Sequence, residues 1–248
     1  MRYLILSDIH SNLEALEKCF ELAEGKYDQV LCLGDLVGYG PDPNPVITRI
    51  QSTAQAIVRG NHDKACCGLM GTEDFNFLAR MATDWTRTHL TPEYFEFLRN
   101  LPNGPVQVDD MELVHGSPVD EDDYIFDSLD AAQAFRLANA RIIFFGHSHR
   151  QGGFLLTDGK RLQPIQLPPM EDDEPARIDL DDSAQYLINP GSVGQPRDGD
   201  WRAAFVILDS DQHRVDFYRT PYNLAKTQEK MRAEGLPEPL IARLEVGR

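Results

Sequence analysis

The sequence predicts an α/β fold with parallel strands joined by helices. Short apolar runs alternate with amphipathic segments through the first third of the chain, which is typical of strands connected by crossover helices. From Gln151 onward the helical periodicity stops and short apolar runs between turn residues take over, which indicates an antiparallel sheet in the second half. The length of 248 residues fits one large α/β domain, so we expect residues 1–248 to form a single domain.

The first expected elements are a strand, a helix and a second strand. Tyr3 to Ser7 is an apolar run of strand length. Apolar residues then recur every three or four positions from about Asn12 to Glu24, and Gly25 follows as a stop signal, so this segment predicts a helix. Val30 to Leu33 predicts the second strand.

The same rhythm continues after a proline-rich loop at Pro41 to Pro45. We expect Pro45 to open a helix, because its fixed φ suits the first helical turn, and Ala56 to Val58 to form a third strand. Two further helices are predicted, one from the helical spacing of apolar residues between Phe75 and Trp85 and one opened by the cap Thr91-Pro92.

The remaining apolar runs predict strands, with few helical segments among them. The expected strands are Met111 to Val114, Ile142 to Phe145, Tyr186 to Ile188, Ala204 to Leu208 and Val215 to Tyr218. A helix capped near Ser128 lies between the first two, and two short helices are expected from Leu224 to the end. The acidic, proline-rich segment Gln166 to Asp182 is interpreted as a solvated loop or hairpin tip without chemistry.

Composition and charge exclude several classes of protein. Hydrophobic residues make up 42% and charged residues 26% of the chain, which is ordinary for a globular enzyme and unlike a disordered chain. The net charge of −16 opposes binding to nucleic acid polymers and to anionic membranes. Four cysteines without a C-x-x-C pair, together with a first apolar run too short for a signal peptide, predict a cytoplasmic protein.

Residues that bind metals follow the predicted strands. Alone, Asp8-Ile9-His10 favours a helix cap followed by a polar loop residue. However, metal-binding residue types also follow the next four strands at Asp35, at Asn61-His62-Asp63, at His115 and at His147-Ser148-His149. Five of the seven histidines thus lie just after a strand, where the loops of an α/β sheet converge on a ligand.

This group of side chains exceeds the needs of one cation. It contains four or five histidines, two or three aspartates and an asparagine, with no cysteine, so we expect two ions. Imidazole mixed with carboxylate favours manganese, iron or zinc over calcium or magnesium.

The ordered pattern D-x-H, G-D, G-N-H-D, H and G-H-x-H resembles the calcineurin-like metallophosphoesterase superfamily. Further matches are Gly38-Tyr39-Gly40-Pro41, the segment Asn189 to Arg197 and Gly235-Leu236-Pro237, which resemble a small prokaryotic branch related to diadenosine tetraphosphatases and serine/threonine phosphatases. The resemblance spans nearly the whole chain. It implies a four-layer α/β/β/α sandwich of two mixed sheets flanked by helices.

The resemblance also implies a ligand set for two divalent ions, with manganese favoured. The first ion would be held by Asp8, His10 and His149, the second by Asn61, His115 and His147, and Asp35 would bridge both. A hydroxide between the two ions would then attack phosphorus directly, without a phosphoenzyme.

Three more residues are candidates for catalysis or substrate binding. By resemblance, His62 would protonate the leaving oxygen or stabilise the transition state, and the alternative is a structural histidine beside the ligands. Arg59 and Arg197 are candidate phosphate contacts, and Arg197 could instead pair with Asp198 or Asp200. In related protein phosphatases an aspartate three positions after the bridging aspartate orients the histidine; here that position is Gly38, which disfavours protein phosphatase activity.

The leading functional hypothesis is therefore a metal-dependent phosphoesterase that hydrolyses a small phosphate ester. The alternatives are a dinucleoside polyphosphate hydrolase and a catalytically silent scaffold of the same fold. A nuclease is disfavoured because the chain is acidic and has no basic stripe. We expect a small phosphorylated substrate, and neither a nucleic acid polymer nor a membrane as a partner.

Overall fold

The computed structural model describes all 248 residues. Its strands are β1 (Arg2–Leu6), β2 (Gln29–Cys32), β3 (Ala54–Ile57), β4 (Val106–Val108), β5 (Met111–Leu113), β6 (Ile142–Phe144), β7 (Gly152–Thr157), β8 (Arg161–Pro164), β9 (Ala176–Asp179), β10 (Gln185–Asn189), β11 (Ala203–Asp209) and β12 (Arg214–Thr220). Its helices are α1 (Leu13–Ala23), α2 (Pro43–Thr53), α3 (Asn61–Cys66), α4 (Phe77–His89), α5 (Pro92–Arg99), α6 (Ser128–Leu137), α7 (Leu224–Ala233), α8 (Glu238–Ala242) and the 3₁₀ turn η1 (Arg243–Glu245).

The strands form two mixed sheets of six strands each. The first has the order β3-β2-β1-β11-β12-β9 and the second the order β4-β5-β6-β10-β7-β8. In the first sheet β1, β2 and β3 run parallel, and in the second β5, β6 and β10 run parallel. The remaining neighbours are antiparallel.

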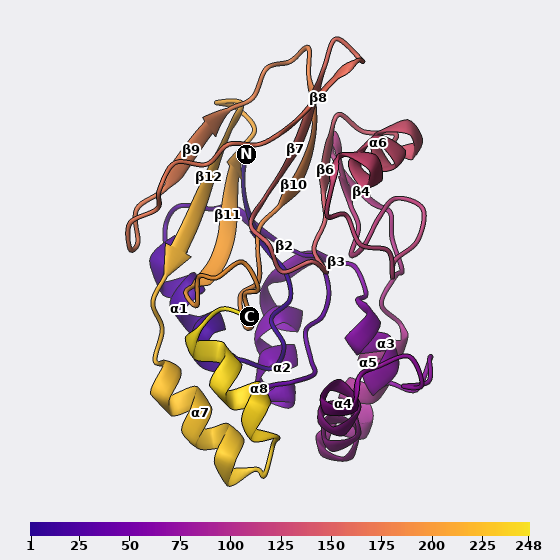
Figure 1. Cartoon of the computed structure of the whole chain (residues 1–248), viewed down its shortest axis with the longest axis vertical. Helices are drawn as coiled ribbons and strands as arrows, with labels where there is room; N and C mark the ends of the chain where they lie inside the picture. Colours follow the sequence, from indigo (N-terminus) through magenta and orange to yellow (C-terminus); the bar gives the residue numbers. More distant parts are fainter.

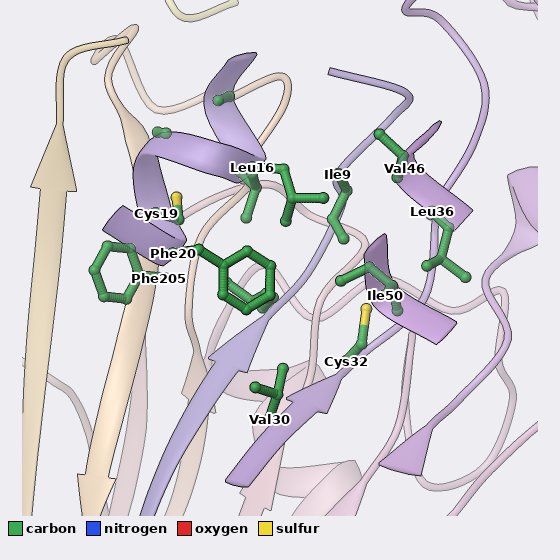
Figure 2. Packing of buried hydrophobic residues seen from close by; sticks show 14 of the residues in the cluster. Ile9, Leu16, Cys19, Phe20, Val30, Cys32, Leu36, Val46, Ile50 and Phe205 are labelled. Atoms are coloured by element: carbon green, nitrogen blue, oxygen red, sulfur yellow. The ribbon is translucent and has the colours of Figure 1, made fainter. Parts of the chain in front are cut away.

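The alternation of side chains along β1 explains how the layers stack. Tyr3 and Ile5 join a buried cluster to which both sheets contribute, so they lie between the sheets. Leu4 and Leu6 point the other way and pack with residues of α1 and α2. Figure 2 shows this outer packing, with Leu16, Cys19 and Phe20 of α1 and Ile50 of α2 lying over the strands. Each fully buried leucine of this kind contributes roughly 1.5–3 kcal/mol to folding.

The second sheet is covered on its outer face by α6. Ala131, Ala134 and Phe135 of this helix share a buried cluster with Ile143 of β6 and Leu187 of β10. In Figure 1, α6 lies beside β6 while α1 and α2 lie on the side of β11 and β2. The order of layers is helix, sheet, sheet, helix, which confirms the predicted four-layer α/β/β/α sandwich.

Helix boundaries agree closely with the expected signals. The Asn12 side chain accepts a hydrogen bond from the Ala15 N–H and caps α1, and Thr91 caps α5 in the same way. The helix expected to open at Pro45 begins two residues earlier, at Pro43, which occupies the first helical turn instead. The two predicted C-terminal helices are present as α7 and α8.

One expectation about the second half of the chain is wrong. Its strands do not form an antiparallel sheet of their own, because β9, β11 and β12 extend the first sheet and β7, β8 and β10 extend the second. β10 also pairs parallel with β6. The acidic segment Gln166 to Asp182 is not all loop either, since it contains β9. Local periodicity predicts that a segment is a strand, but the partner of that strand depends on contacts distant in sequence.

The carboxyl ends of the parallel strands carry the loops on which function depends. Asp8 follows β1, Asp35 follows β2, Asn61 follows β3, and the second sheet adds His115 after β5 and His147 after β6. None of the helices is both long enough and apolar enough to cross a membrane.

Candidate metal centre

Two groups of buried side chains meet where these loops converge. The first group contains Asp8, His10, Asp35 and His149, and the second contains Asp35, His115 and His147. Within each group, one potential ligand atom per residue lies within 4.8 Å of all the others. Asp35 belongs to both groups and is therefore in the position of a bridge.

Neighbouring candidate ligand atoms lie 3.1 to 3.6 Å from one another, which is close enough for them to bind the same cation. His149 Nε2 lies 3.2 Å from Asp8 Oδ1, and the Oδ2 atom of Asp35 lies 3.6 Å from His10 Nε2 and 3.4 Å from His115 Nε2. The Nε2 atoms of His10 and His149 are 3.1 Å apart. These atoms come from loops up to 141 positions apart in sequence, and the topology alone brings them together.

Three of the histidines are oriented by backbone carbonyl groups. The Nδ1 atom lies 3.1 Å from the Val37 carbonyl oxygen in His10, 2.7 Å from that of Leu33 in His115, and 2.6 Å from that of Gln195 in His149. An Nδ1–H that donates to a carbonyl leaves the lone pair of Nε2 free to bind a metal, so each ring is held in a ligating tautomer.

Several polar atoms at the centre have no hydrogen-bond partner. They are buried, and each belongs to a residue predicted as a ligand: Asp8 Oδ1, Asp35 Oδ2, Asn61 Oδ1 and His115 Nε2. Buried polar atoms of native proteins are almost always paired, so this convergence of unpaired acceptors requires an explanation. A pair of divalent cations bound by nitrogen and oxygen ligands satisfies all four atoms, and the residues present fit such a group.

The backbone of the candidate ligands is strained. Asp8, His10, Asp35, His147 and His149 all have φ between 48° and 62°, in the left-handed region that residues other than glycine avoid. Each such residue costs on the order of 1–3 kcal/mol, and strain of this kind gathers at functional sites.

Charges at the centre are strongly coupled. Burial raises the pKa of Asp8 to about 6. Burial also opposes the charged forms of Asp35 and His115, but their mutual attraction outweighs it, so the pKa of Asp35 lies well below its usual value and that of His115 rises to about 10. Burial lowers the pKa of His10 and His149.

His62 lies beside the ligand groups but in neither of them. The backbone N–H of His62 donates to Asp35 Oδ1 at 2.9 Å, and the imidazole ring packs against Tyr39 and Phe75 at centroid distances of 4.4 and 4.8 Å. Its Nδ1 atom has no hydrogen-bond partner. Burial lowers the pKa of His62 to about 4.

No carboxylate orients the His62 ring. A Cβ atom at Gly38, which has φ of 92°, would lie 2.7 Å from His62 Nδ1, so a side chain at this position would collide with the ring. Asp63 turns away and accepts hydrogen bonds from the N–H groups of Val37 and Gly60. Packing by aromatic neighbours takes the place of a hydrogen-bonding partner.

Arg197 lies at a cavity beside the ligand groups. The cavity has a volume of about 340 Å³, and Asn61, His62 and His147 also line it. The Arg197 guanidinium donates to Gln195 Oε1 at 2.9 Å and lies 5.6 Å from the centre of the Tyr39 ring. The expected alternative does not occur, because Asp198 pairs with Arg219 and Asp200 pairs with Arg202.

Arg59 lies elsewhere and does not line this cavity. Its guanidinium forms an ion pair with Glu121 at 2.9 Å. The structure therefore brings His62 and Arg197 to the cavity beside the candidate ligands, and it directs Arg59 to the loop between β5 and α6.

Three aromatic side chains of the cavity wall were not predicted as functional residues: Tyr39, Phe75 and Tyr124. Tyr39 lies in the Gly38 to Pro41 segment, which matches the family pattern. The sequence near Tyr124 has one unusual feature, which is that two aromatic residues, Tyr124 and Phe126, come just after the acidic run Asp120 to Asp123. An aromatic pair beside a run of charges in a loop could have marked this segment as a candidate.

Thiol reagents are expected to spare the activity of this protein. Cys66 and Cys67, which follow the Asn61 loop, are fully buried, and burial raises the pKa of both thiols, so little reactive thiolate forms at neutral pH. Turnover measured before and after iodoacetamide treatment should differ by less than about twofold. Loss of turnover in the Cys66→Ala/Cys67→Ala double variant, with metals retained, would contradict a mechanism without cysteine.

Comparison with known proteins shows the family to which the chain belongs. The sequence profile of the calcineurin-like phosphoesterase superfamily domain matches residues 1–213. A metallophosphoesterase from Sphaerobacter thermophilus is 39% identical, with a TM-score of 0.86 over 100% of this chain and 99% of that one. An uncharacterised protein of Methanocaldococcus jannaschii is 34% identical over 98% of this chain and 97% of its own. A hypothetical protein from Pyrococcus horikoshii, 21% identical, shares the fold with a TM-score of 0.77 over 100% and 98% of the two chains. The chain belongs to the calcineurin-like phosphoesterase superfamily.

Proposed function

We propose that this protein is a dinuclear metal-dependent phosphoesterase that hydrolyses a small phosphate ester. One ion would be held by Asp8, His10 and His149, the other by Asn61, His115 and His147, with Asp35 shared between them. The observation that carries the proposal is the position of Asp35, whose unpaired Oδ2 atom lies 3.6 Å from His10 Nε2 and 3.4 Å from His115 Nε2. A carboxylate between two cations reduces their mutual repulsion.

The chain's own residues would bind and orient the ester. When bound, the two ions lower the pKa of water and offset negative charge on the phosphate. Arg197 is the arginine of the cavity and would hold a phosphate oxygen or the leaving group. His62 would donate a proton to the leaving oxygen or stabilise charge that develops there, because its ring lines the same cavity.

The proposal extends to the metal, the compartment and the partners. The ligand set contains nitrogen and oxygen but no sulfur, which suits manganese. The four cysteines are free and buried, in keeping with a reducing cytoplasm. The net charge of −16 favours a small phosphorylated substrate over a nucleic acid polymer or a membrane.

A panel of substrates tests the proposal. We expect the manganese-loaded protein to hydrolyse an aryl phosphate monoester or an aryl phosphodiester, and to leave a short oligonucleotide intact. Removal of metal with a chelator should abolish the reaction, and added Mn²⁺ should restore it. A protein that binds two ions but hydrolyses neither aryl ester would support the silent scaffold instead.

A further inference from the structure

His147 differs from the other candidate histidine ligands in how its ring is held. In His10, His115 and His149 the Nδ1 atom contacts a backbone carbonyl, whereas no protein group forms a hydrogen bond with either ring nitrogen of His147. Only the backbone N–H of His147 is anchored, by donation to Asp8 Oδ2 at 3.2 Å. A ligand without a hydrogen-bonding partner needs another means of orientation.

Tyr124 supplies that orientation by stacking. Its ring lies 3.8 Å from the His147 ring, centroid to centroid, with 24° between the planes. Phe126 continues the stack on Tyr124 at 4.9 Å and 9°, and the Arg150 guanidinium lies 5.0 Å from the Phe126 ring. The stack thus joins the loop between β5 and α6 to the segment that contains His147 and His149.

Ion pairs hold this loop to α3. Glu121 pairs with both Arg59 and Lys64 at 2.9 Å, and Lys64 also pairs with Asp122. Arg59, Lys64 and Glu121 are mostly buried, so water screens these charges less than it screens an exposed pair. A cavity of about 180 Å³ lies between the loop and α6, and Tyr124 is part of its lining. The side of Tyr124 that faces α6 is therefore not fully packed, so the stack and the ion pairs must hold the ring in place.

We propose that Tyr124 is a positioning residue for His147 and sets the metal affinity of the site formed by Asp35, Asn61, His115 and His147. The ring of Tyr124 fixes the plane of the His147 imidazole, and the Arg59–Glu121–Lys64 ion pairs fix the loop that carries Tyr124. This inference rests on the proposed function in one respect, namely that His147 holds an ion.

Metal titration of the purified full chain tests the role of Tyr124. Calorimetry with Mn²⁺ on chelator-treated wild-type protein should resolve two binding events per chain. In Tyr124→Ala we expect one event to weaken about 10- to 100-fold, the usual cost of losing a group that orients a metal ligand, and the other to stay unchanged. Tyr124→Phe keeps the ring and should restore both affinities.

Two further variants test whether the loss of metal affinity arises from the contact between Tyr124 and His147. Phe75→Ala removes an aromatic ring from the same cavity, but that ring packs on His62 rather than on a candidate ligand, so both affinities should match the wild type. Glu121→Gln removes the charge that Arg59 and Lys64 share and should weaken the same event as Tyr124→Ala, by a smaller factor. Glu121→Gln with unchanged affinities would overturn the role of the ion pairs.

The outcomes separate this inference from the proposed function. Wild-type protein that binds no ion would overturn both. Wild-type protein that binds a single ion would overturn the dinuclear proposal, and it would overturn the role of Tyr124 as well only if Tyr124→Ala binds that ion with unchanged affinity. Wild-type protein that binds two ions, with unchanged affinities in Tyr124→Ala, would overturn the role of Tyr124 alone. Equal weakening of both events in Tyr124→Ala, or no restoration in Tyr124→Phe, would also overturn it, because neither result follows from stacking on a single ligand.

Discussion

Replacement of His62 by alanine is expected to lower turnover by about 100- to 10,000-fold while both metal ions stay bound. The lower turnover follows from the loss of a group positioned to transfer a proton or stabilise charge, and the retained metals follow because His62 belongs to neither ligand group. Steady-state kinetics and elemental analysis on the same preparation measure the two effects. The loss should be smallest for nitrophenolate leaving groups, which need no proton.

His213→Ala is the matched control, because His213 is an exposed histidine that pairs with Asp182, far in the fold from the candidate ligands. It should leave turnover unchanged. Loss of metal from His62→Ala would show that His62 is a ligand or a structural residue. Equal impairment for nitrophenolate and alkoxide leaving groups, with metals retained, would instead assign His62 to charge stabilisation.

Asp35→Asn is expected to weaken metal binding by more than about 100-fold and to abolish turnover at low metal concentration. A neutral amide offsets less charge between two cations than a carboxylate does, and this position is shared by both ligand groups. Mn²⁺ is expected to raise the melting temperature of the wild type but not that of this variant. The melting temperature of the metal-free form serves as the folding control.

Asp74→Asn is the matched control: it removes the same charge from the cavity beside the ligand groups, and Asp74 belongs to neither group. Asp74 is an exposed residue of the cavity lining, so its replacement should leave metal affinity within about threefold of the wild type, as screening predicts. If Asp74→Asn and Asp35→Asn weakened metal binding equally, general charge rather than a bridging ligand would account for the effect.

Much of the candidate site could be predicted from the sequence because its residues occupy defined places relative to the strands. Asp8, Asp35 and His115 each lie just past an apolar run, and an apolar run of four or five residues is a local signal. Cap residues are local as well: Thr91 caps α5 as predicted, and the helix predicted from about Asn12 begins directly after that residue. The number of metal-binding side chains indicates two ions, but the assignment of each ligand to one ion or the other rests on resemblance to the family.

Strand pairing could not be predicted from local patterns. Short apolar runs mark β11 and β12 as strands, but nothing within these segments specifies that β11 lies beside β1, some 200 residues earlier. Prediction of an antiparallel second half therefore identified β10, β11 and β12 as strands, missed β9, and gave the wrong sheet arrangement. The four-layer arrangement of sheets and helices was predicted from the resemblance to the family, because periodicity alone does not indicate how strands pair.

Orientation of individual side chains was also beyond reach. Arg59 is only two residues from Asn61, yet its N–H donates to the Pro102 carbonyl and its guanidinium turns to Glu121. The contact between Tyr124 and His147 could not be predicted either, because it joins loops that follow different strands. The left-handed backbone conformation of five candidate ligands could not be predicted either. The folded sheets impose this strain, and no sequence motif indicates it.

Metal stoichiometry tests the central claim most directly. Chelator-treated protein is reconstituted with Mn²⁺, freed of unbound metal and subjected to elemental analysis together with Asp35→Asn. Seven candidate ligands, one of which is the shared carboxylate of Asp35, predict close to two ions per wild-type chain and a clear loss in the variant. Saturation at one ion per chain, or equal content in wild type and Asp35→Asn, would contradict the dinuclear centre.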